Sequence, residues 1–178
     1  NRVIIYQGAL NIGRGLEYMI RAMRNIDAKL IIVGDGDISK GLKDITMSLK
    51  LEEKVSFIGL VEPAELSSLT RSASLGLNLL EPKGLNYIHS LANKFFDYIE
   101  AGIPQLCMRF PEYVRINEEY EVAILVEGLN ELYLAKTIND LFNDQEYYNK
   151  LRNNTLKARE ELCWQNEEQK LLEIFKKI

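Results

Sequence analysis

The stretch from Asn93 to Pro104 groups three side chains that could bind an anionic ligand. At roughly 100° per residue of an α-helix, Asn93, Lys94 and Asp97 fall on one side, and the apolar residues of the stretch fall on the other. An amide, an ammonium group and a carboxylate are thus presented together near the start of a helix, where free backbone N–H groups favour an anion such as a phosphate. The pattern predicts a binding site for a polar, negatively charged molecule.

The composition is that of one globular domain covering residues 1–178. Of the 178 residues, 47% are hydrophobic, which is enough to bury a core. The formal charge of -4, with no basic run longer than Lys176-Lys177, argues against a nucleic acid partner. The longest apolar runs are five or six residues, whereas a membrane span needs about 20. We therefore expect no transmembrane segment.

The few cysteines and the single histidine also exclude some kinds of site. Cys107 reads as a strand residue and Cys163 as a helix residue, and the two form no Cys-x-x-Cys pair. Neither a disulfide framework nor a Cys/His metal site is expected, so we predict no metal ligands. A reducing, cytoplasmic setting fits this usage best.

Strand-like apolar runs alternate with helical periodicity. The expected strands cover residues 3–6, 29–33, 55–58, 75–80, 105–108 and 122–126. Helices are expected between the strands, among them one from Leu91 to Ala101 that is ended by Gly102 and Pro104. From Asn130 onward the pattern is helical to the end, with Asn130 and Asp144 as caps. The alternation predicts an α/β fold, a Rossmann-like doubly wound parallel sheet of about six strands in the order 3-2-1-4-5-6, with C-terminal helices.

In such a sheet, ligands bind beyond the carboxyl ends of the strands, near the switch point between the first and fourth strands. The loops at that edge are residues 8–15, 34–38, 59–63 and 81–94. The Gly34-Asp35-Gly36 turn superficially resembles a dinucleotide fingerprint, but Ser39 stands where the third glycine is required and Gly41 comes too late. A nicotinamide-binding function therefore loses its main motif.

Four motifs in order resemble those of a known family. They are Gln7-Gly8-x5-Arg14-Gly15, Ile32-Val33-Gly34-Asp35-Gly36, Val55-Ser56-Phe57-Ile58-Gly59-Leu60-Val61 and Asn93-Lys94-x2-Asp97-Tyr98-x2-Ala101-Gly102-x-Pro104. From about Val3 to Ile178 the chain resembles the C-terminal half of a GT-B glycosyltransferase of family GT4. The resemblance implies a domain that binds a nucleoside-diphosphate sugar and works beside an N-terminal acceptor domain, which is expected outside this chain.

On this resemblance, Asp97 is the carboxylate that contacts the ribose hydroxyls of the donor, since a carboxylate can accept two such hydrogen bonds. The family usually has a glutamate there, one methylene longer. The family's other carboxylate, eight residues earlier and facing the sugar, is replaced here by His89. His89 is expected either to contact the sugar or to be an ordinary surface histidine.

The resemblance also implies two cations at the donor's diphosphate. The family usually has an arginine after the first-loop glycine, where this chain has Ala9, and a lysine near the end of that loop, where it has Arg14. Arg14 can offer a bidentate fork to a phosphate, and Lys94 is expected to supply the second charge. With His89, these two residues are the predicted catalytic side chains. The alternative is that both cations are ordinary solvated surface residues.

Loop positions complete the predicted donor site. Those carried over from the family pattern are Gly8, Gly15, Gly34, Asp35, Gly36, Val61 and Asn93. The glycines of the first loop would let the backbone approach a phosphate, with simple turn chemistry as the alternative. Val61 would contact the base through backbone groups, so the sequence does not predict which base is bound.

The reaction implied is transfer of a sugar from a nucleoside-diphosphate donor to an acceptor hydroxyl, with retention of anomeric configuration and without a metal or another cofactor. The family also implies a cytoplasmic enzyme of polysaccharide or glycoconjugate assembly. Any association with a membrane surface would come through the acceptor domain. This chain alone is expected to bind donor weakly and to transfer nothing.

Two other functions stay open at this point. Another GT-B enzyme, such as a sugar-nucleotide epimerase or a hydrolase, would need acid and base groups in the cleft, for which Glu81 and His89 are the candidates. A non-catalytic domain that has lost donor binding is favoured by Ala9 and His89, where the family pattern is not kept.

Apolar residues near the C-terminus follow helical spacing. They are Tyr147-Tyr148, Leu171, Ile174, Phe175 and Ile178. Packing within the domain is the expected role of these side chains. The last helix of the resembled enzymes often crosses to the N-terminal domain, so the stripe from Leu171 onward is alternatively an interdomain face.

Overall fold

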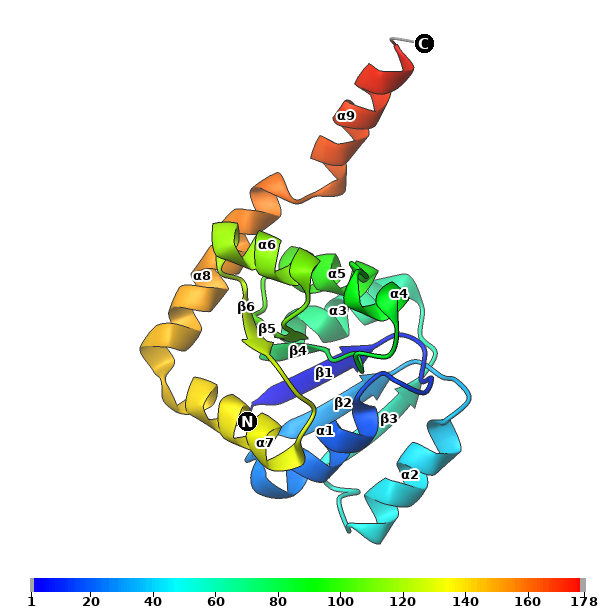
Figure 1. Cartoon of the computed structure of the whole chain (residues 1–178). Coiled ribbons are helices and arrows are strands. Elements are labelled where there is room, and N and C mark those ends of the chain that lie inside the picture. Colours follow the sequence, from blue (N-terminus) through cyan, green and yellow to red (C-terminus); the bar gives the residue numbers. More distant parts are fainter. Residues whose placement is uncertain (1, 177–178) are drawn as a thin grey trace.

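The computed structural model describes residues 2–176 and contains one sheet of six strands in the order β3-β2-β1-β4-β5-β6 (Figure 1). Each neighbouring pair of strands is parallel. The strands are β1 (Val3–Gln7), β2 (Lys29–Val33), β3 (Val55–Gly59), β4 (Leu75–Asn78), β5 (Gln105–Met108) and β6 (Ala123–Val126). The predicted fold class and strand order are confirmed.

Helices follow the strands, as a doubly wound sheet requires (Figure 1). They are α1 (Leu16–Ala22), the 3-10 helix η1 (Met23–Asn25), α2 (Ser39–Ser48), α3 (Pro63–Ser72), α4 (Leu85–Ile88), α5 (Asn93–Ala101), α6 (Pro111–Tyr120), α7 (Glu131–Asn143), α8 (Gln145–Glu161) and α9 (Trp164–Phe175). Helix α1 lies beside α2 and α7, whereas α5 lies beside α3 and α8. In the part of the chain described here, no helix is long and apolar enough to cross a membrane.

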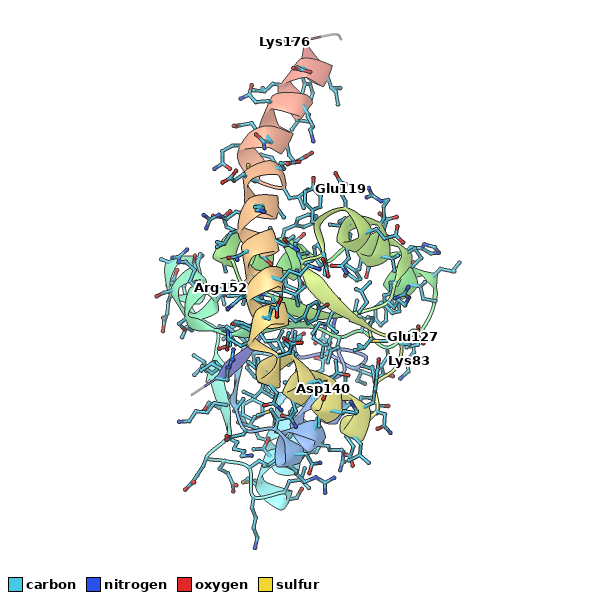
Figure 2. The ribbon with its side chains drawn as sticks, turned by 90° about the vertical axis from the view of Figure 1, so that its left-hand side faces the viewer. Lys83, Glu119, Glu127, Asp140, Arg152 and Lys176 are labelled. Carbon is cyan, nitrogen blue, oxygen red and sulfur yellow. The ribbon has the colours of Figure 1, made fainter. Side chains whose placement is uncertain are left out.

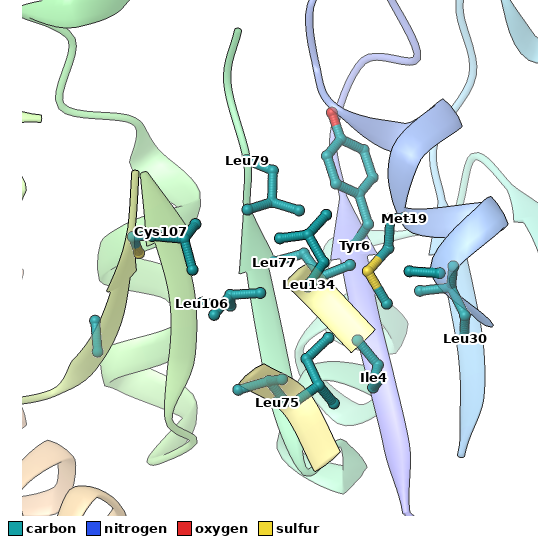
Figure 3. Close-up of a cluster of buried hydrophobic side chains, with 14 of the residues drawn as sticks. Ile4, Tyr6, Met19, Leu30, Leu75, Leu77, Leu79, Leu106, Cys107 and Leu134 are labelled. Atoms are coloured by element: carbon teal, nitrogen blue, oxygen red, sulfur yellow. The ribbon is translucent and has the colours of Figure 1, made fainter. Parts of the chain in front are cut away.

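Side chains of β1 alternate between the two faces of the sheet because successive residues of a strand point to opposite sides. Ile4 and Tyr6 pack with Met19 of α1 and Leu134 of α7 (Figure 3). Ile5, between them, belongs to a second buried cluster on the other side of the sheet. Both faces are therefore covered, and this explains why the strands are nearly continuous in apolar residues.

The ends of several elements are set by the residues expected to set them. Gly102 adopts a left-handed conformation (φ 71°) at the C-terminus of α5, and the Asn130 side chain accepts hydrogen bonds from two backbone N–H groups of α7. Asp144 caps α8 through the N–H of Tyr147. Helix α5 begins at Asn93 rather than at Leu91. The polar side chains Asn93, Lys94 and Asp97 therefore begin at the first residue of α5.

Other details of the structure also differ from the sequence prediction. Strand β4 ends at Asn78 rather than at residue 80, because the chain then turns toward the loop after β1, where the N–H of Glu81 donates to the Gly13 carbonyl (2.9 Å). Cys163 is not helical but extended, since it forms the N-cap of α9. The short helix α4 was not expected, because its four residues are too few to show a period.

Helix α9 projects away from the rest of the chain (Figures 1 and 2). Leu171, Ile174 and Phe175 are 44%, 58% and 66% exposed, so the prediction that they pack within this domain is wrong for these three residues. Helical periodicity marks an apolar face but does not say what covers it. Ile178 lies outside the described residues. Tyr148, by contrast, is buried as expected, and its hydroxyl donates to the Ser74 carbonyl (2.9 Å).

Candidate functional site

Backbone hydrogen bonds join the loops that follow β1, β2, β3 and β4. The N–H of Gly8 donates to the Val33 carbonyl (3.0 Å), and the N–H of Gly34 donates to the Gly59 carbonyl (2.8 Å). The bond from Glu81 to Gly13 fixes the loop after β4 against the loop after β1. The predicted ligand-binding edge is therefore one connected surface.

Four of the predicted donor-binding residues line one shallow cavity of about 290 Å³ at this edge. Its lining residues are Gly8, Ala9, Val33, Gly34, Asp35, Leu60, Val61 and Leu66. Most of this lining is apolar, with backbone groups of the loops between the side chains. Such a cavity can accept a small flat group that offers an apolar face and a polar edge.

The glycines of the second loop are required for close packing against the first loop. Gly34 has a φ of +132°, and a Cβ atom there would lie 2.0 Å from the carbonyl oxygen of Gly8. A Cβ atom at Gly36 would lie 2.6 Å from the Leu10 carbonyl oxygen. Gly15 immediately precedes α1 at the end of the first loop. Both glycines of the second loop thus have a structural role, whatever the ligand.

Asp35 is turned toward its own loop. Its carboxylate accepts hydrogen bonds from the Gly36 N–H (2.8 Å) and from the Ser39 hydroxyl. The Ser39 and Gly36 bonds lower the pKa of Asp35. Asp37 stands two residues away, a spacing at which two carboxylates could share a cation, but no group of three His, Cys, Asp or Glu side chains within residues 2–176 is placed to hold a metal.

Asp97 is held in place by a chain of hydrogen bonds from β1 and α3. The Gln7 side-chain amide donates to the Asp97 carboxylate (2.8 Å), and the Thr70 hydroxyl donates to the Gln7 carbonyl oxygen (2.7 Å). Partial burial raises the pKa of Asp97, while the Gln7 bond and the nearby Lys94 lower it. Gln7 donates to only one oxygen of the carboxylate, so the carboxylate can still accept hydrogen bonds from a ligand bound at this edge of the sheet.

Lys94 lies above the ring of Tyr6, with its Nζ atom 3.7 Å from the ring centroid. It also lies beside Gly8, where a Cβ atom would come within 3.4 Å of Nζ. Burial, together with the Arg14 guanidinium, lowers the pKa of Lys94 to about 7. The titratable or charged side chains around it are Tyr6, Arg14, Asp97 and Cys107. A charged ammonium group that is buried here without an anion beside it is energetically unfavourable, so the site favours binding of an anion.

This arrangement predicts that anion binding weakens as pH rises. The free protein loses the Lys94 proton as pH rises through about 7, whereas a bound diphosphate would keep it, so binding takes up a proton. We expect the affinity for a nucleotide sugar to fall by up to about tenfold per pH unit between pH 7 and about 9. Calorimetric titrations across this range check the slope. Lys94→Met should remove it, and a wild-type affinity that is flat over this range would contradict the prediction.

Arg14 reaches the same edge from the loop after β1. Its guanidinium carbon lies 5.5 Å from the centroid of the Tyr87 ring, and its Nε is buried without a hydrogen-bond partner among the described residues. Arg14 is also close enough to Lys94 to depress the pKa of that lysine. Two cations therefore lie near each other at this edge, as the binding of a diphosphate would require. They are not ordinary solvated surface residues.

The other predicted side chains are less closely tied to this edge. Asn93 is exposed at the first position of α5. His89 is exposed and follows α4, and it does not line the cavity after β1 to β3. Glu81 forms a salt bridge with Lys83 (2.5 Å). Of the acid and base candidates for an epimerase or a hydrolase, Glu81 is thus paired with a lysine, and His89 is exposed outside this cavity.

Four supporting residues were not predicted as part of the site. Tyr6 and Gln7, the last residues of β1, contact Lys94 and Asp97, while Thr70 and Tyr87 support Gln7 and Arg14. In the sequence, Tyr6 reads only as a strand residue. The sequence did offer one signal for Tyr6, namely its position near the carboxyl end of the first strand, where ligands of such sheets bind. Neighbouring residues of a strand point to opposite faces, so Tyr6 and Gln7 contact different residues.

A family model described as "Glycosyl transferases group 1" matches residues 1–158. An uncharacterised glycosyltransferase of Methanocaldococcus jannaschii is 28% identical over 182 aligned residues, which cover 98% of this chain and 45% of that protein. This chain thus spans about half the length of that relative.

Solved structures share the fold. HepE of Anabaena, in a crystal structure with UDP, has a TM-score of 0.81 at 19% identity, covering all of this chain and 49% of that one. A C-terminal domain of a glycosyl transferase group 1 protein (LpcC) of Francisella tularensis has a TM-score of 0.73 at 16% identity, covering 88% of this chain and 83% of that one. The match to the second structure shows the same fold in a domain of similar extent.

Proposed function

Because the chain belongs to the glycosyl transferases group 1 family, we propose that it is the donor-binding domain of an enzyme that transfers a sugar from a nucleoside diphosphate to an acceptor hydroxyl. The observation that carries the proposal is the convergence of Arg14, Lys94 and Asp97 at the edge where the loops after β1 and β4 meet. The presence of UDP in the HepE structure supports a nucleotide as the ligand of this edge.

In this proposal, each side chain meets a different part of the donor. Asp97 accepts hydrogen bonds from the ribose hydroxyls, and the cavity beside Val61 receives the base. Arg14 and Lys94 face the diphosphate. When the bond between the anomeric carbon and the diphosphate oxygen breaks, the negative charge grows on the leaving group, and these cations stabilise it. The acceptor oxygen forms the new bond on the same side of the sugar and releases its proton.

We propose further that the reaction needs no metal ion, since two cations already face the diphosphate. The group that takes the acceptor's proton would come from a partner domain, as would any contact with a membrane surface. The exposed apolar face of α9 is the proposed surface toward that domain. Residues 1–178 alone would then bind donor weakly and transfer nothing. Measurable sugar transfer by this chain alone would contradict that part of the proposal.

Nucleotide titration tests donor binding directly. We expect calorimetry with UDP, GDP, CDP and ADP to show that one base binds best. Arg14→Ala should weaken that binding by about tenfold to 100-fold, since a charge-assisted hydrogen bond contributes roughly 1.5–3 kcal/mol. Arg152→Ala is the matched control, because Arg152 is an exposed arginine on α8 (Figure 2).

Two outcomes of this titration count against the proposal. One is that wild type binds none of the four nucleotides, which would favour a domain that has lost donor binding. The other is that Arg14→Ala and Arg152→Ala bind equally well.

A further inference from the structure

Both cations of the site lie over tyrosine rings, and although Asp97 is near enough to Lys94 to affect its pKa, it is not in direct ion-pair contact with it. Lys94 stands 3.7 Å from the centroid of Tyr6, and Arg14 stands 5.5 Å from the centroid of Tyr87. In the described chain, from residue 2 to residue 176, neither cation takes part in a salt bridge. The Nε of Arg14 also has no hydrogen-bond partner there.

The kind of partner matters for a site that must bind an anion. A carboxylate in direct ion-pair contact with either cation would neutralise its charge and compete with an incoming phosphate. The face of an aromatic ring attracts a cation through its quadrupole without cancelling the positive charge. A ring can therefore fix the direction of the cation while the charge remains available to the ligand.

The Tyr6 ring is itself firmly held. Tyr6 is 1% exposed, and its hydroxyl donates to the carbonyl of Ala9 in the first loop (2.8 Å). Figure 3 shows the ring at the level of Leu79, with the hydroxyl toward the loop end of the sheet. The same side chain thus fixes both the loop that carries Gly8 and the lysine that stands over it.

The Tyr87 ring is held by the first loop as well. A Cβ atom at Gly13 would lie 3.0 Å from the Tyr87 ring, so the ring packs directly on this glycine. The N–H of Tyr87 donates to the Gly84 carbonyl (3.2 Å), within the turn that forms α4. The unpredicted helix α4 therefore has a definite effect, because it brings a ring against Arg14.

We propose that Tyr6 and Tyr87 are positioning residues, which hold Lys94 and Arg14 in place while leaving both charges free for the donor's diphosphate. This inference rests on the proposed function. It adds that affinity depends on the rings themselves, through the cations that they hold, and that the tyrosine hydroxyls matter less.

A double-mutant cycle tests this coupling with UDP, GDP, CDP and ADP as the probes. Tyr6→Leu should weaken binding of the best nucleotide by about 5–30-fold, since cation–π contacts contribute up to about 2 kcal/mol when desolvated. Tyr6→Phe keeps the ring and should stay within about threefold of wild type. In a Lys94→Met background, Tyr6→Leu should have no further effect, because the cation is already gone.

The same cycle applies to the second ring. Tyr87→Leu should weaken binding in wild type but not in an Arg14→Ala background, and Tyr87→Phe should stay close to wild type. Tyr133→Leu, on the exposed side of α7, is the control for loss of a tyrosine elsewhere.

The contact between Lys94 and the Tyr6 ring can also be measured in the absence of a ligand. Nuclear magnetic resonance should find the Hε protons of Lys94 shifted upfield by the ring current in wild type and in Tyr6→Phe, and this measurement remains decisive if Tyr6→Leu does not fold. Ordinary lysine shifts in wild type would overturn the inference for Tyr6. Equal losses from Tyr6→Leu with and without Lys94 would overturn it too. Wild type that binds no nucleotide would contradict the proposed function itself and this inference with it, whereas binding that ignores both rings would overturn only the inference.

Discussion

We expect the Asp97→Ala variant to bind its best nucleoside diphosphate about 100-fold or more weakly than wild type. The carboxylate is oriented before the ligand arrives, since Gln7 donates to it and Thr70 fixes Gln7. Each hydrogen bond from a ribose hydroxyl to a charged oxygen contributes roughly 1.5–3 kcal/mol, so loss of two such bonds exceeds a factor of 100. Isothermal titration calorimetry measures this loss.

The same substitution should leave the fold intact. Partial burial raises the pKa of Asp97, so the protein does not rely on this charge for stability near neutral pH. We therefore expect thermal unfolding of Asp97→Ala close to that of wild type. Asp140→Ala is the control, because Asp140 is an exposed carboxylate of α7 paired with Lys136. A loss of affinity no larger than that of the control would exclude Asp97 from the donor site.

Gly34→Ala should be the most damaging small substitution in the chain. Its Cβ atom would lie 2.0 Å from the Gly8 carbonyl oxygen, and a φ of +132° is one that residues with a side chain rarely adopt. Neither group can move easily, because the Gly8 and Gly34 N–H groups are both bonded to neighbouring strands. We expect the free energy of unfolding to fall by about 3 kcal/mol or more. Urea denaturation measures the change.

Gly41→Ala makes the same chemical change where nothing opposes it. Gly41 lies in α2, and no atom stands within 4 Å of its added Cβ. Alanine favours a helix over glycine by roughly 0.5–1 kcal/mol, so this variant should be slightly more stable than wild type. Equal stability of the two variants would show that the loops after β1 and β2 are not packed as described.

The fold was predictable because each of its signals lies within a short stretch of sequence. The apolar residues of β1 and β2 follow one another without a polar break, and Gly102 ends α5 where a left-handed residue was expected. The strand order followed from the doubly wound pattern. The nearness of Arg14 and Lys94 followed from the family resemblance, together with the rule that loops at one edge of the sheet meet.

The supports of the site were not predictable in the same way. The bond from Gln7 to Asp97 joins residues 90 apart in the sequence, so it depends on how α5 lies across the end of β1. The contact of Tyr87 with Arg14 depends on a helix of four residues, too short to show a period. For the apolar stripe of α9, the sequence left packing within the domain and an interdomain face both open, since such a stripe looks the same whichever surface covers it.

The position of Trp164 has a practical consequence for spectroscopy. It is the only tryptophan, it begins α9 and it is 65% exposed. Its indole therefore meets water in the folded chain much as it would in an unfolded one, and its emission will hardly follow the unfolding of the sheet. Whatever covers α9 would instead shift that emission toward the blue. The chain thus carries a natural fluorescent reporter for any contact that its last helix makes, separate from any probe of the edge where Lys94 and Asp97 lie.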